Sequence, residues 1–234
     1  MDSFTFRSEM PFPSESSNTG PLRIFSCLAG EALDGRGGSP QAFAAERKRH
    51  AMKPCRINRS KAALLVVDIQ ERLLPAIFEK ERVLANALRL AQGAGVLGVP
   101  AFVTEQYRKG LGATVPELAA ALAGFAPVEK MTFSSCGSPG LLETFAAKGV
   151  TDLILCGIEA HVCVTQTALD LLARNFTTFV VADAVSSRTV ENWHYGVERM
   201  RDAGAVIVST EMVLFELLGQ AGTDEFKKIL PLVK

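Results

Sequence analysis

From Lys61 onward, short apolar runs alternate with longer segments whose apolar residues repeat at helical spacing. Ala62–Val67 (AALLVV) is apolar throughout, like a strand buried on both faces, whereas Val83 to Ala91 follows the period of an amphipathic helix. Strands that alternate with helices form a parallel sheet, and right-handed crossovers limit its topology. The sequence therefore predicts an α/β fold: a doubly wound, Rossmann-like six-stranded parallel sheet with helices on both faces.

The predicted strands and helices fill this part of the chain. The strands are expected at 62–67, 101–103, 126–130, 152–156, 177–182 and 205–208. The helices are expected at 83–97, 116–122, from 138 onward, 161–174, 190–203 and 210–218. Ser138 and Pro139 are expected to begin the third of these helices, as its N-cap and first helical residue.

Residues 1–57 differ in composition from residues 58–234, which form the predicted domain. They are rich in Ser, Gly and Pro and lack apolar periodicity, which is typical of a disordered tail. A second interpretation is a mis-annotated, over-long translation whose true start is Met52. Charged residues such as Arg7 and Glu9 argue against a secretory signal, and the acidic residues among the first fifteen fit an organelle transit peptide poorly.

Charge and cysteine content exclude several classes of protein. The chain has 25 basic and 25 acidic residues and a pI near 6.8, so it lacks the basic surface expected of a nucleic-acid-binding protein. No apolar run reaches the roughly 18 residues that would span a membrane. The five cysteines, at 27, 55, 136, 156 and 163, lack the spacing of a disulfide framework or a zinc site, which favours a reducing, cytoplasmic location.

Polar residues follow four of the predicted strands, and ligands of such sheets bind outside the carboxyl ends of the strands. These residues are Asp68, Thr104 to Gln106, Lys130, and the segment from Cys156 to Cys163. Cys163 is expected in the first turn of a helix, where free N–H groups and a nearby cation favour a thiolate. A carboxylate, an ammonium and a thiol that converge in one crevice would suit nucleophilic catalysis.

Each of these residues also has a structural interpretation. Cys163 would equally suit a buried position between helix and sheet, Asp68 a turn after its strand, and Lys130 a solvated surface. His161 is two residues from Cys163, so the two side chains are not expected to face each other on a helix. Cys156 is expected in the core, and Cys136 remains a candidate for a second thiol in the site.

These motifs resemble the isochorismatase-like cysteine hydrolase superfamily. The resemblance rests on Asp68-Ile69-Gln70 after an apolar strand, on Lys130 at a strand end, and on the segment from Cys156 to Cys163. The stretches 104–107, 110–112, 181–188 and 199–205 resemble isochorismatase domain-containing proteins most closely. Together the motifs cover residues 58–232, in order and at the spacing of the family.

The resemblance implies a catalytic triad of Asp68, Lys130 and Cys163. Cys163 would attack a carbonyl carbon, Asp68 would act as general base and then as acid, and Lys130 would hold the thiolate and orient Asp68. The resemblance also implies a cis peptide at Ile158–Glu159, which would direct backbone N–H groups of Glu159 or Ala160 and of Cys163 toward an oxyanion. Candidates for lining the substrate pocket are Gln70, Gln106, Tyr107, Phe133 and His161.

Two departures from superfamily members narrow the expected chemistry. Nicotinamidases carry a metal-binding Asp-x-His after the second strand, where this chain has Glu105-Gln106-Tyr107, so neither a metal nor another cofactor is expected. Isochorismatases proper have a small residue where this chain has Cys163, so amide or ester hydrolysis is favoured. The alternatives are an isochorismatase-type hydrolase without a covalent step and a non-catalytic binding or scaffold protein.

The expected partner is a small-molecule substrate, without nucleic acid or membrane. A homo-oligomer is also expected, because the superfamily usually assembles through helices beside the site. The sequence itself offers only one apolar segment for assembly, Ile229 to Val233. Convergence of Asp68, Lys130 and Cys163 in one place would distinguish an enzyme from a scaffold.

Overall fold

The computed structural model describes residues 55–234, so the interpretations of the first 54 residues lie outside the described residues. The strands are β1 (Ala62–Val67), β2 (Ala101–Gln106), β3 (Val128–Lys130), β4 (Asp152–Ile158), β5 (Thr177–Ser186) and β6 (Val206–Val208). The α-helices are α2 (Lys80–Leu97), α3 (Arg108–Leu111), α4 (Pro116–Ala121), α5 (Leu141–Ala147), α6 (Thr165–Ala173), α7 (Val190–Asp202), α8 (Thr210–Leu218) and α9 (Asp224–Ile229). Short helical turns are η1 (Arg59–Lys61), η2 (Leu74–Ala76), η3 (Ser135–Gly137), η4 (Ala160–Val164) and η5 (Leu230–Leu232).

The six strands form one parallel sheet in the order β3-β2-β1-β4-β5-β6, as the sequence predicts. The chain starts at the centre with β1, builds outward to β3, and returns to add β4 on the other side of β1. The strand order therefore reverses between β1 and β4, which is where a doubly wound sheet opens a crevice for ligands.

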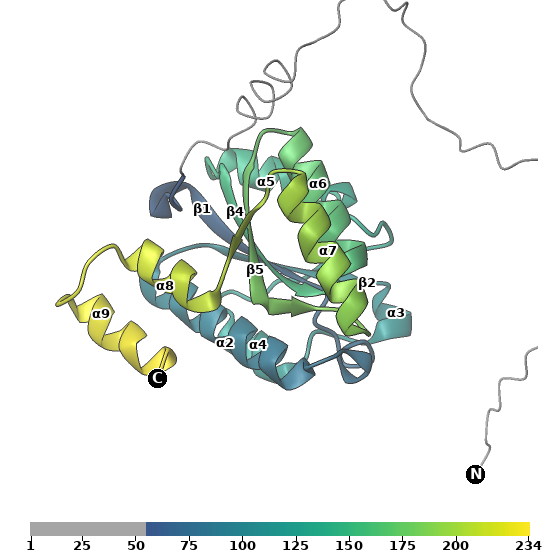
Figure 1. Cartoon of the computed structure of the whole chain (residues 1–234), viewed down its shortest axis with the longest axis horizontal. Helices are drawn as coiled ribbons and strands as arrows, with labels where there is room; N and C mark the ends of the chain where they lie inside the picture. The colour runs from purple at the N-terminus through teal and green to yellow at the C-terminus, as the bar shows by residue number, and fades with distance from the viewer. Residues whose placement is uncertain (1–54) are drawn as a thin grey trace, which may run out of the picture. The chain divides into compact units, whose positions relative to one another are not determined.

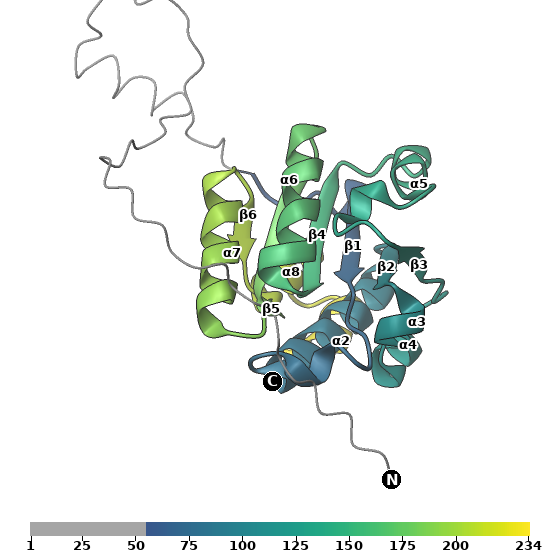
Figure 2. The same cartoon turned by 90° about the vertical axis from the view of Figure 1, so that its right-hand side faces the viewer.

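Helices cover both faces of the sheet, as Figures 1 and 2 show. On one face, α2, α4, α8 and α9 pack against alternate strand residues such as Leu64 and Ile154. On the other face, α5, α6 and α7 pack against the residues between them, such as Leu65 and Leu155. Because β1 and β4 are buried along their whole length, both strands are continuous apolar runs in the sequence.

Three predicted boundaries are wrong, and one of them is the end of β5, which is expected at Ala182 but lies at Ser186. The strand after Pro100 does not end at Val103 but continues through Thr104, Glu105 and Gln106, which are polar and buried. The helix after Lys130 does not start at Ser138: α5 begins at Leu141 after Gly140, whose φ of 77° suits glycine. The N-cap in this segment is Ser134, whose hydroxyl accepts a hydrogen bond from Cys136 at the start of η3.

The apolar C-terminal segment packs inside its own domain. Ile229 is fully buried, and Leu232 and Val233 pack against the same core cluster as α2 and α8. This segment therefore buries part of its apolar surface within its own domain.

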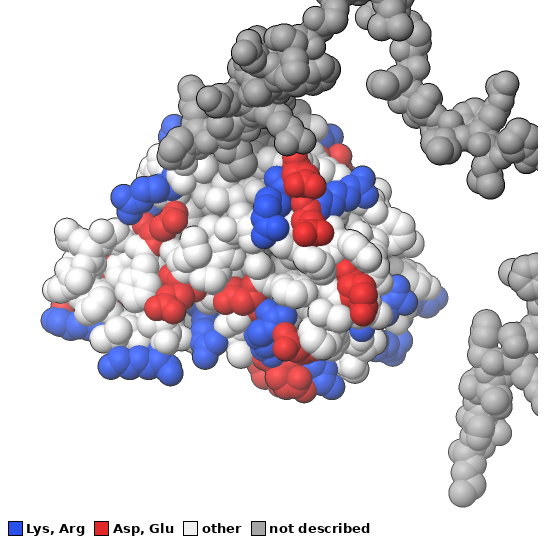
Figure 3. All heavy atoms as spheres, in the orientation of Figure 1, with Lys and Arg blue, Asp and Glu red and all other residues white. Residues whose placement is uncertain are grey.

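The surface carries charges of both signs close together. On the face in Figure 3, Lys and Arg side chains lie among Asp and Glu side chains without a large area of one sign. Within residues 55–234, no helix has the length and apolar character that a membrane span needs.

Candidate active site

Asp68 lies directly after β1, next to the reversal in strand order. Its backbone φ is 52°, in the left-handed region, and its carbonyl accepts a hydrogen bond from the N–H of Gln70. Aspartate tolerates this conformation better than most residues, so the chain can turn sharply here. The turn leaves the Asp68 side chain buried at the carboxyl edge of the sheet.

Lys130 reaches Asp68 from the last residue of β3. Its Nζ donates to Asp68 Oδ2 (2.6 Å) and to Gln106 Oε1 (2.7 Å). It also donates to the carbonyl oxygens of Phe133 (3.1 Å) and Thr132 (3.3 Å). The side chains of Asp68 and Lys130 are both fully buried, so the ammonium is held as a fixed positive charge among oxygen atoms.

Cys163 lies in η4, the first helical turn after β4, as the sequence predicts. This turn is a π-helix in which the Glu159 carbonyl accepts from the N–H groups of both Val162 and Val164. Thr167 on α6 donates its hydroxyl to the Cys163 carbonyl (2.7 Å) and so fixes the turn. Cys163 is 6% exposed, and its thiol lies near enough to Asp68 and Lys130 for both groups to influence its pKa.

The surroundings of Cys163 act on its thiol in opposite directions. Burial and the charge of Asp68 raise the pKa of the thiol, Lys130 lowers it, and together they bring it to about 12. Burial likewise raises the pKa of Asp68, although Lys130, Thr104 and Cys163 lower it. Burial therefore favours a thiol beside a carboxylate of increased basicity, whereas Lys130 favours the thiolate.

Thr104, which carried no predicted role, contacts the site directly. Its hydroxyl donates to Asp68 Oδ1 at 2.7 Å, and the residue is fully buried. The signal was present in the sequence, because Thr104 and Gln106 are two apart and so lie on one face of β2. Thr104 was named among the polar residues at the strand ends, but its contact with Asp68 was not predicted because the strand was expected to end at Val103.

Of the five predicted pocket residues, Gln70 and Gln106 are occupied by protein contacts. The amide of Gln70 donates to the carbonyls of Gln106 (3.0 Å) and Gly112 (2.7 Å) and accepts from the N–H of Gln106 (2.8 Å). Gln106 accepts from Lys130 and donates to the Met131 carbonyl (3.0 Å). Their polar atoms therefore hold the site together and do not face an incoming ligand, which corrects the prediction for both.

Tyr107, Phe133 and His161 occupy different positions around the site. Tyr107 and Phe133 are 45% and 54% exposed, and the Tyr107 ring packs over Gly110. The His161 ring lies 2.9 Å from Ser187 Oγ through Nδ1, so it braces the turn and does not face Cys163. Tyr107 and Phe133 flank Lys130, since the N–H of Tyr107 and the carbonyl of Phe133 both bond to it.

The segment from Ile158 to Ala160 connects β4 with the helix of Cys163. The peptide bond between Ile158 and Glu159 is cis, and Ile158 and Ala160 are fully buried. The Glu159 carboxylate accepts from the N–H (3.1 Å) and Nε (3.0 Å) of Arg188 after β5. The cis peptide is therefore held by the buried residues Ile158 and Ala160 and by the hydrogen bonds between Glu159 and Arg188.

Comparison with known proteins assigns the family. The model of the isochorismatase domain matches residues 62–212. Isochorismatase domain-containing protein 2 of Danio rerio is 40% identical over 178 residues, which cover 76% of this chain and 89% of that protein. The chain belongs to the isochorismatase family. The family assignment supports a hydrolase and agrees with the resemblance drawn from the sequence.

Solved structures of the isochorismatase type have the same fold. The MAR1 ribonuclease of Caenorhabditis elegans aligns with a TM-score of 0.72 and 41% identity, over 76% of this chain and 92% of that chain. YcaC of Pseudomonas aeruginosa, solved with covalent acrylamide, aligns at 0.72 with 26% identity, over 78% and 93%. YcaC of Escherichia coli, an octameric hydrolase of unknown specificity, aligns at 0.73 with 28% identity, over 77% and 91%.

Glu105 lies at the position where nicotinamidases carry a metal-binding residue, and in this chain its carboxylate binds groups of the protein. Glu105 Oε1 accepts from the N–H and hydroxyl of Thr114, both at 2.8 Å, and Oε2 lies 3.3 Å from Arg108. Its carboxylate therefore braces the loop after β2. Among residues 55–234, no group of three or more His, Cys, Asp or Glu side chains is arranged to hold a metal ion.

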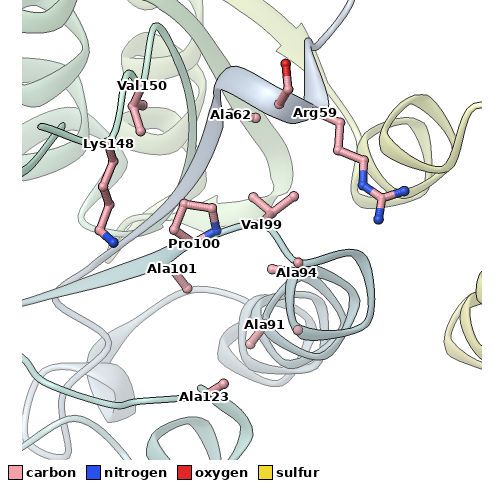
Figure 4. Close-up of a pocket in the computed structure, with 13 residues that line it drawn as sticks. Arg59, Ala62, Ala91, Ala94, Val99, Pro100, Ala101, Ala123, Lys148 and Val150 are labelled. Atoms are coloured by element: carbon pink, nitrogen blue, oxygen red, sulfur yellow. The ribbon is translucent and has the colours of Figure 1, made fainter. Parts of the chain in front are cut away.

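A cavity of about 520 Å³ lies at the opposite edge of the sheet of this isochorismatase-family chain (Figure 4). It is lined by the starts of β1 and β2 and the end of α2, including Ala62, Ala94 and Pro100. The triad lies at the carboxyl ends of the strands, so this cavity is separate from the candidate active site.

Proposed function

We propose that this isochorismatase-family chain is a metal-independent cysteine hydrolase that cleaves a small carbonyl compound, an amide or an ester. The observation that carries the proposal is the buried Asp68–Lys130 ion pair at the carboxyl edge of the sheet, near enough to the buried Cys163 to influence the pKa of its thiol. A thiol, a basic carboxylate and a fixed cation are the groups that covalent hydrolysis needs in one place.

The first half of the reaction forms a bond from sulfur to carbon. The Cys163 thiol gives its proton to Asp68, and the sulfur attacks the carbonyl carbon of the substrate. The carbonyl oxygen becomes an oxyanion, which backbone N–H groups at the start of η4 stabilise. When the oxyanion collapses, the bond from carbon to the leaving group breaks, and Asp68 returns the proton to that amine or alcohol.

The second half regenerates the thiol. A water molecule attacks the thioester, and Asp68 takes its proton. The carboxylic acid product leaves, the sulfur departs as a thiolate, and Asp68 gives the proton back to it. Lys130 donates hydrogen bonds to Asp68 and Gln106, and its positive charge balances the charge of Asp68 and of the departing thiolate.

The covalent acrylamide on a related protein supports a reactive nucleophile in this fold. Acrylamide forms a carbon–sulfur bond with a thiol by addition, so it is a suitable probe for Cys163. The thiol of Cys156 is fully buried inside β4, and burial raises its pKa to about 12 without any neighbouring base. Acrylamide should therefore modify Cys163 and leave Cys156 unmodified in the folded protein.

The decisive experiment compares the native protein with Cys163→Ala. Hydrolysis of 4-nitrophenyl acetate and of a panel of small amides is measured for both, with isochorismate and a short RNA included. Loss of ester or amide hydrolysis in the variant supports the proposal. Retained hydrolysis rejects the covalent step, and cleavage of isochorismate by the variant favours the alternative without a covalent intermediate. Cleavage of RNA alone would point to the activity named for the C. elegans relative.

The proposal also includes a homo-oligomeric assembly and a cytoplasmic location. The octameric relative from E. coli supports a homo-oligomer, and three large apolar side chains flank Lys130 at the surface. This exposed patch consists of Tyr107, Met131 and Phe133, which are 45%, 69% and 54% exposed. We infer that it contributes to the contact between copies. The cysteines of residues 55–234 are free thiols, which supports a reducing, cytoplasmic location.

A further inference from the structure

The ion pair of the site spans three strands of the sheet. Asp68 follows β1 and Lys130 ends β3, but these strands are not neighbours, because β2 lies between them. The Lys130 side chain therefore crosses over β2 to reach Asp68. Two residues of β2 face this crossing, Thr104 toward Asp68 and Gln106 toward Lys130.

We propose that Thr104 is a positioning residue that holds the Asp68 carboxylate and sets the pH range in which Asp68 accepts the proton of Cys163. This inference rests on the proposed function for the role of Asp68. Thr104 touches neither the substrate nor the sulfur in the proposed reaction; it acts through Asp68.

The contacts of the carboxylate carry the inference. Thr104 binds Oδ1 at 2.7 Å and Lys130 binds Oδ2 at 2.6 Å, so each oxygen has its own donor and the carboxylate cannot rotate freely. Asp68 and Thr104 are both fully buried, so water does not replace the hydroxyl when it is removed. The backbone of Asp68 lies in a turn, so these side-chain contacts fix the orientation of the base.

The hydroxyl of Thr104 distinguishes the two protonation states of Asp68. It donates to an ionised carboxylate through a charge-assisted hydrogen bond, which is stronger than a bond to the neutral acid. The ionised form is therefore favoured, and the pKa of Asp68 is lower than burial alone would make it. Removing the hydroxyl should raise the pH at which Asp68 becomes available as a base.

The test is the pH dependence of acrylamide addition to Cys163 in Thr104→Val, followed by mass spectrometry of the intact and digested protein. The rate should fall at acidic pH as Asp68 becomes protonated. In the variant, the midpoint of this acidic limb is expected to rise by about one pH unit, which corresponds to a tenfold change in proton affinity. An unmoved midpoint would overturn the proposal.

Two matched variants separate the hydroxyl from general effects. Thr104→Ser keeps the hydroxyl and is expected to keep the native midpoint; a shift equal to that of the valine variant would reject the proposed role. Thr210→Val removes another buried hydroxyl, which lies 3.0 Å from Asp183 Oδ1, and should leave the midpoint unchanged. If Thr104→Val does not fold, Thr104→Ala replaces it in the same comparison.

Acrylamide addition does not depend on turnover, so the two proposals can fail separately. If Cys163→Ala retains full hydrolysis, the proposed function fails, yet the midpoint still reports whether Thr104 controls Asp68. If hydrolysis requires Cys163 but the midpoint in Thr104→Val equals the native one, only the role of Thr104 fails.

Discussion

At the scale of the residue, the proposed mechanism keeps a proton on Cys163 until the substrate arrives. Burial raises the pKa of this thiol to about 12, so hardly any free thiolate exists at neutral pH. Asp68 lies beside the thiol, and burial raises the pKa of its carboxyl too. The two groups share one proton, and moving it from sulfur to oxygen costs less than releasing it to water. A protein built this way limits reaction of the thiol with stray oxidants.

Asp68→Asn tests this sharing of the proton. The negative charge of Asp68 raises the pKa of Cys163, so its removal lowers that pKa and leaves Lys130 to favour the thiolate. Acrylamide addition at pH 8 should nevertheless be slower than in the native protein, because no carboxylate remains to accept the thiol proton. Hydrolysis of 4-nitrophenyl acetate should be lost, because no group remains to shuttle the proton. Undiminished addition together with retained hydrolysis would contradict the role of Asp68.

Lys130→Met tests the buried ion pair through stability. Removing one partner of a buried pair costs about 3–5 kcal/mol, because the other charge stays buried. Without Lys130 the pKa of Asp68 rises further, so the folded state prefers the protonated acid. The free energy of unfolding of the variant should therefore fall as the pH rises from 4 toward 8.

Urea unfolding at pH 5 and pH 8 measures this effect. The stability difference between native protein and Lys130→Met should be larger at pH 8. The double variant Lys130→Met/Asp68→Asn serves as control and should recover much of the loss, since it leaves no buried charge. A loss that is equal at both values of pH would contradict the assignment to Asp68.

Much of the candidate site could be predicted from the sequence because its residues lie at or after the ends of predicted strands. Asp68 follows β1, Lys130 ends β3 and Cys163 lies in the first turn after β4, and parallel strands bring their carboxyl ends to one edge. Thr104 was missed because its role depends on a side-chain contact across two strands. The effect of burial on the pKa of Cys163 was not predicted, because burial depends on packing from the whole domain, which local spacing does not encode.

At the scale of the element, Gly157 controls the approach of β4 to β1. Its φ is 121°, and a Cβ at this position would overlap the carbonyl oxygen of Val67. Gly157→Ala should therefore disturb the pairing that places Cys163 near Asp68, and lower the free energy of unfolding by several kcal/mol. The expected readouts are a lower Tm and loss of hydrolysis.

Gly95→Ala in α2 is a matched control that is expected to stabilise the protein. This glycine is helical and has open space where a Cβ would be added. The same substitution should raise the free energy of unfolding by about 0.5–1 kcal/mol. A Tm that falls in both variants would show that backbone conformation is not the cause.

The ends of the helices and strands show where the local sequence predicts an element correctly and where it does not. For β1 and α8 the predicted ranges, 62–67 and 210–218, agree with the structure. Where polar residues are buried, as in Thr104 to Gln106, hydrophobic periodicity ends too early. Ser138 and Pro139 have the composition of a helix start, but Ser138 instead follows η3, because Ser134 already caps that turn.

At the scale of the whole molecule, the exposed patch beside Lys130 predicts how copies meet. Sedimentation velocity should give a mass that is a multiple of 25.1 kDa. Phe133→Glu should weaken the assembly, because a charge would be buried in the contact. Met212→Glu on α8 changes a side chain of similar exposure elsewhere and should leave the mass unchanged. Equal masses for all three proteins would contradict the role of the patch.

The reversal of strand order divides the triad between two halves of the chain. β1 to β3 carry Asp68 and Lys130, whereas Cys163 follows β4 in the second half. A chain cut at the turn between α5 and β4, near Gly149, would leave the base and the cation on one fragment and the nucleophile on the other. Covalent labelling of Cys163 at neutral pH would then report the reassociation of two separately expressed polypeptides, which makes this sheet a candidate split-protein sensor.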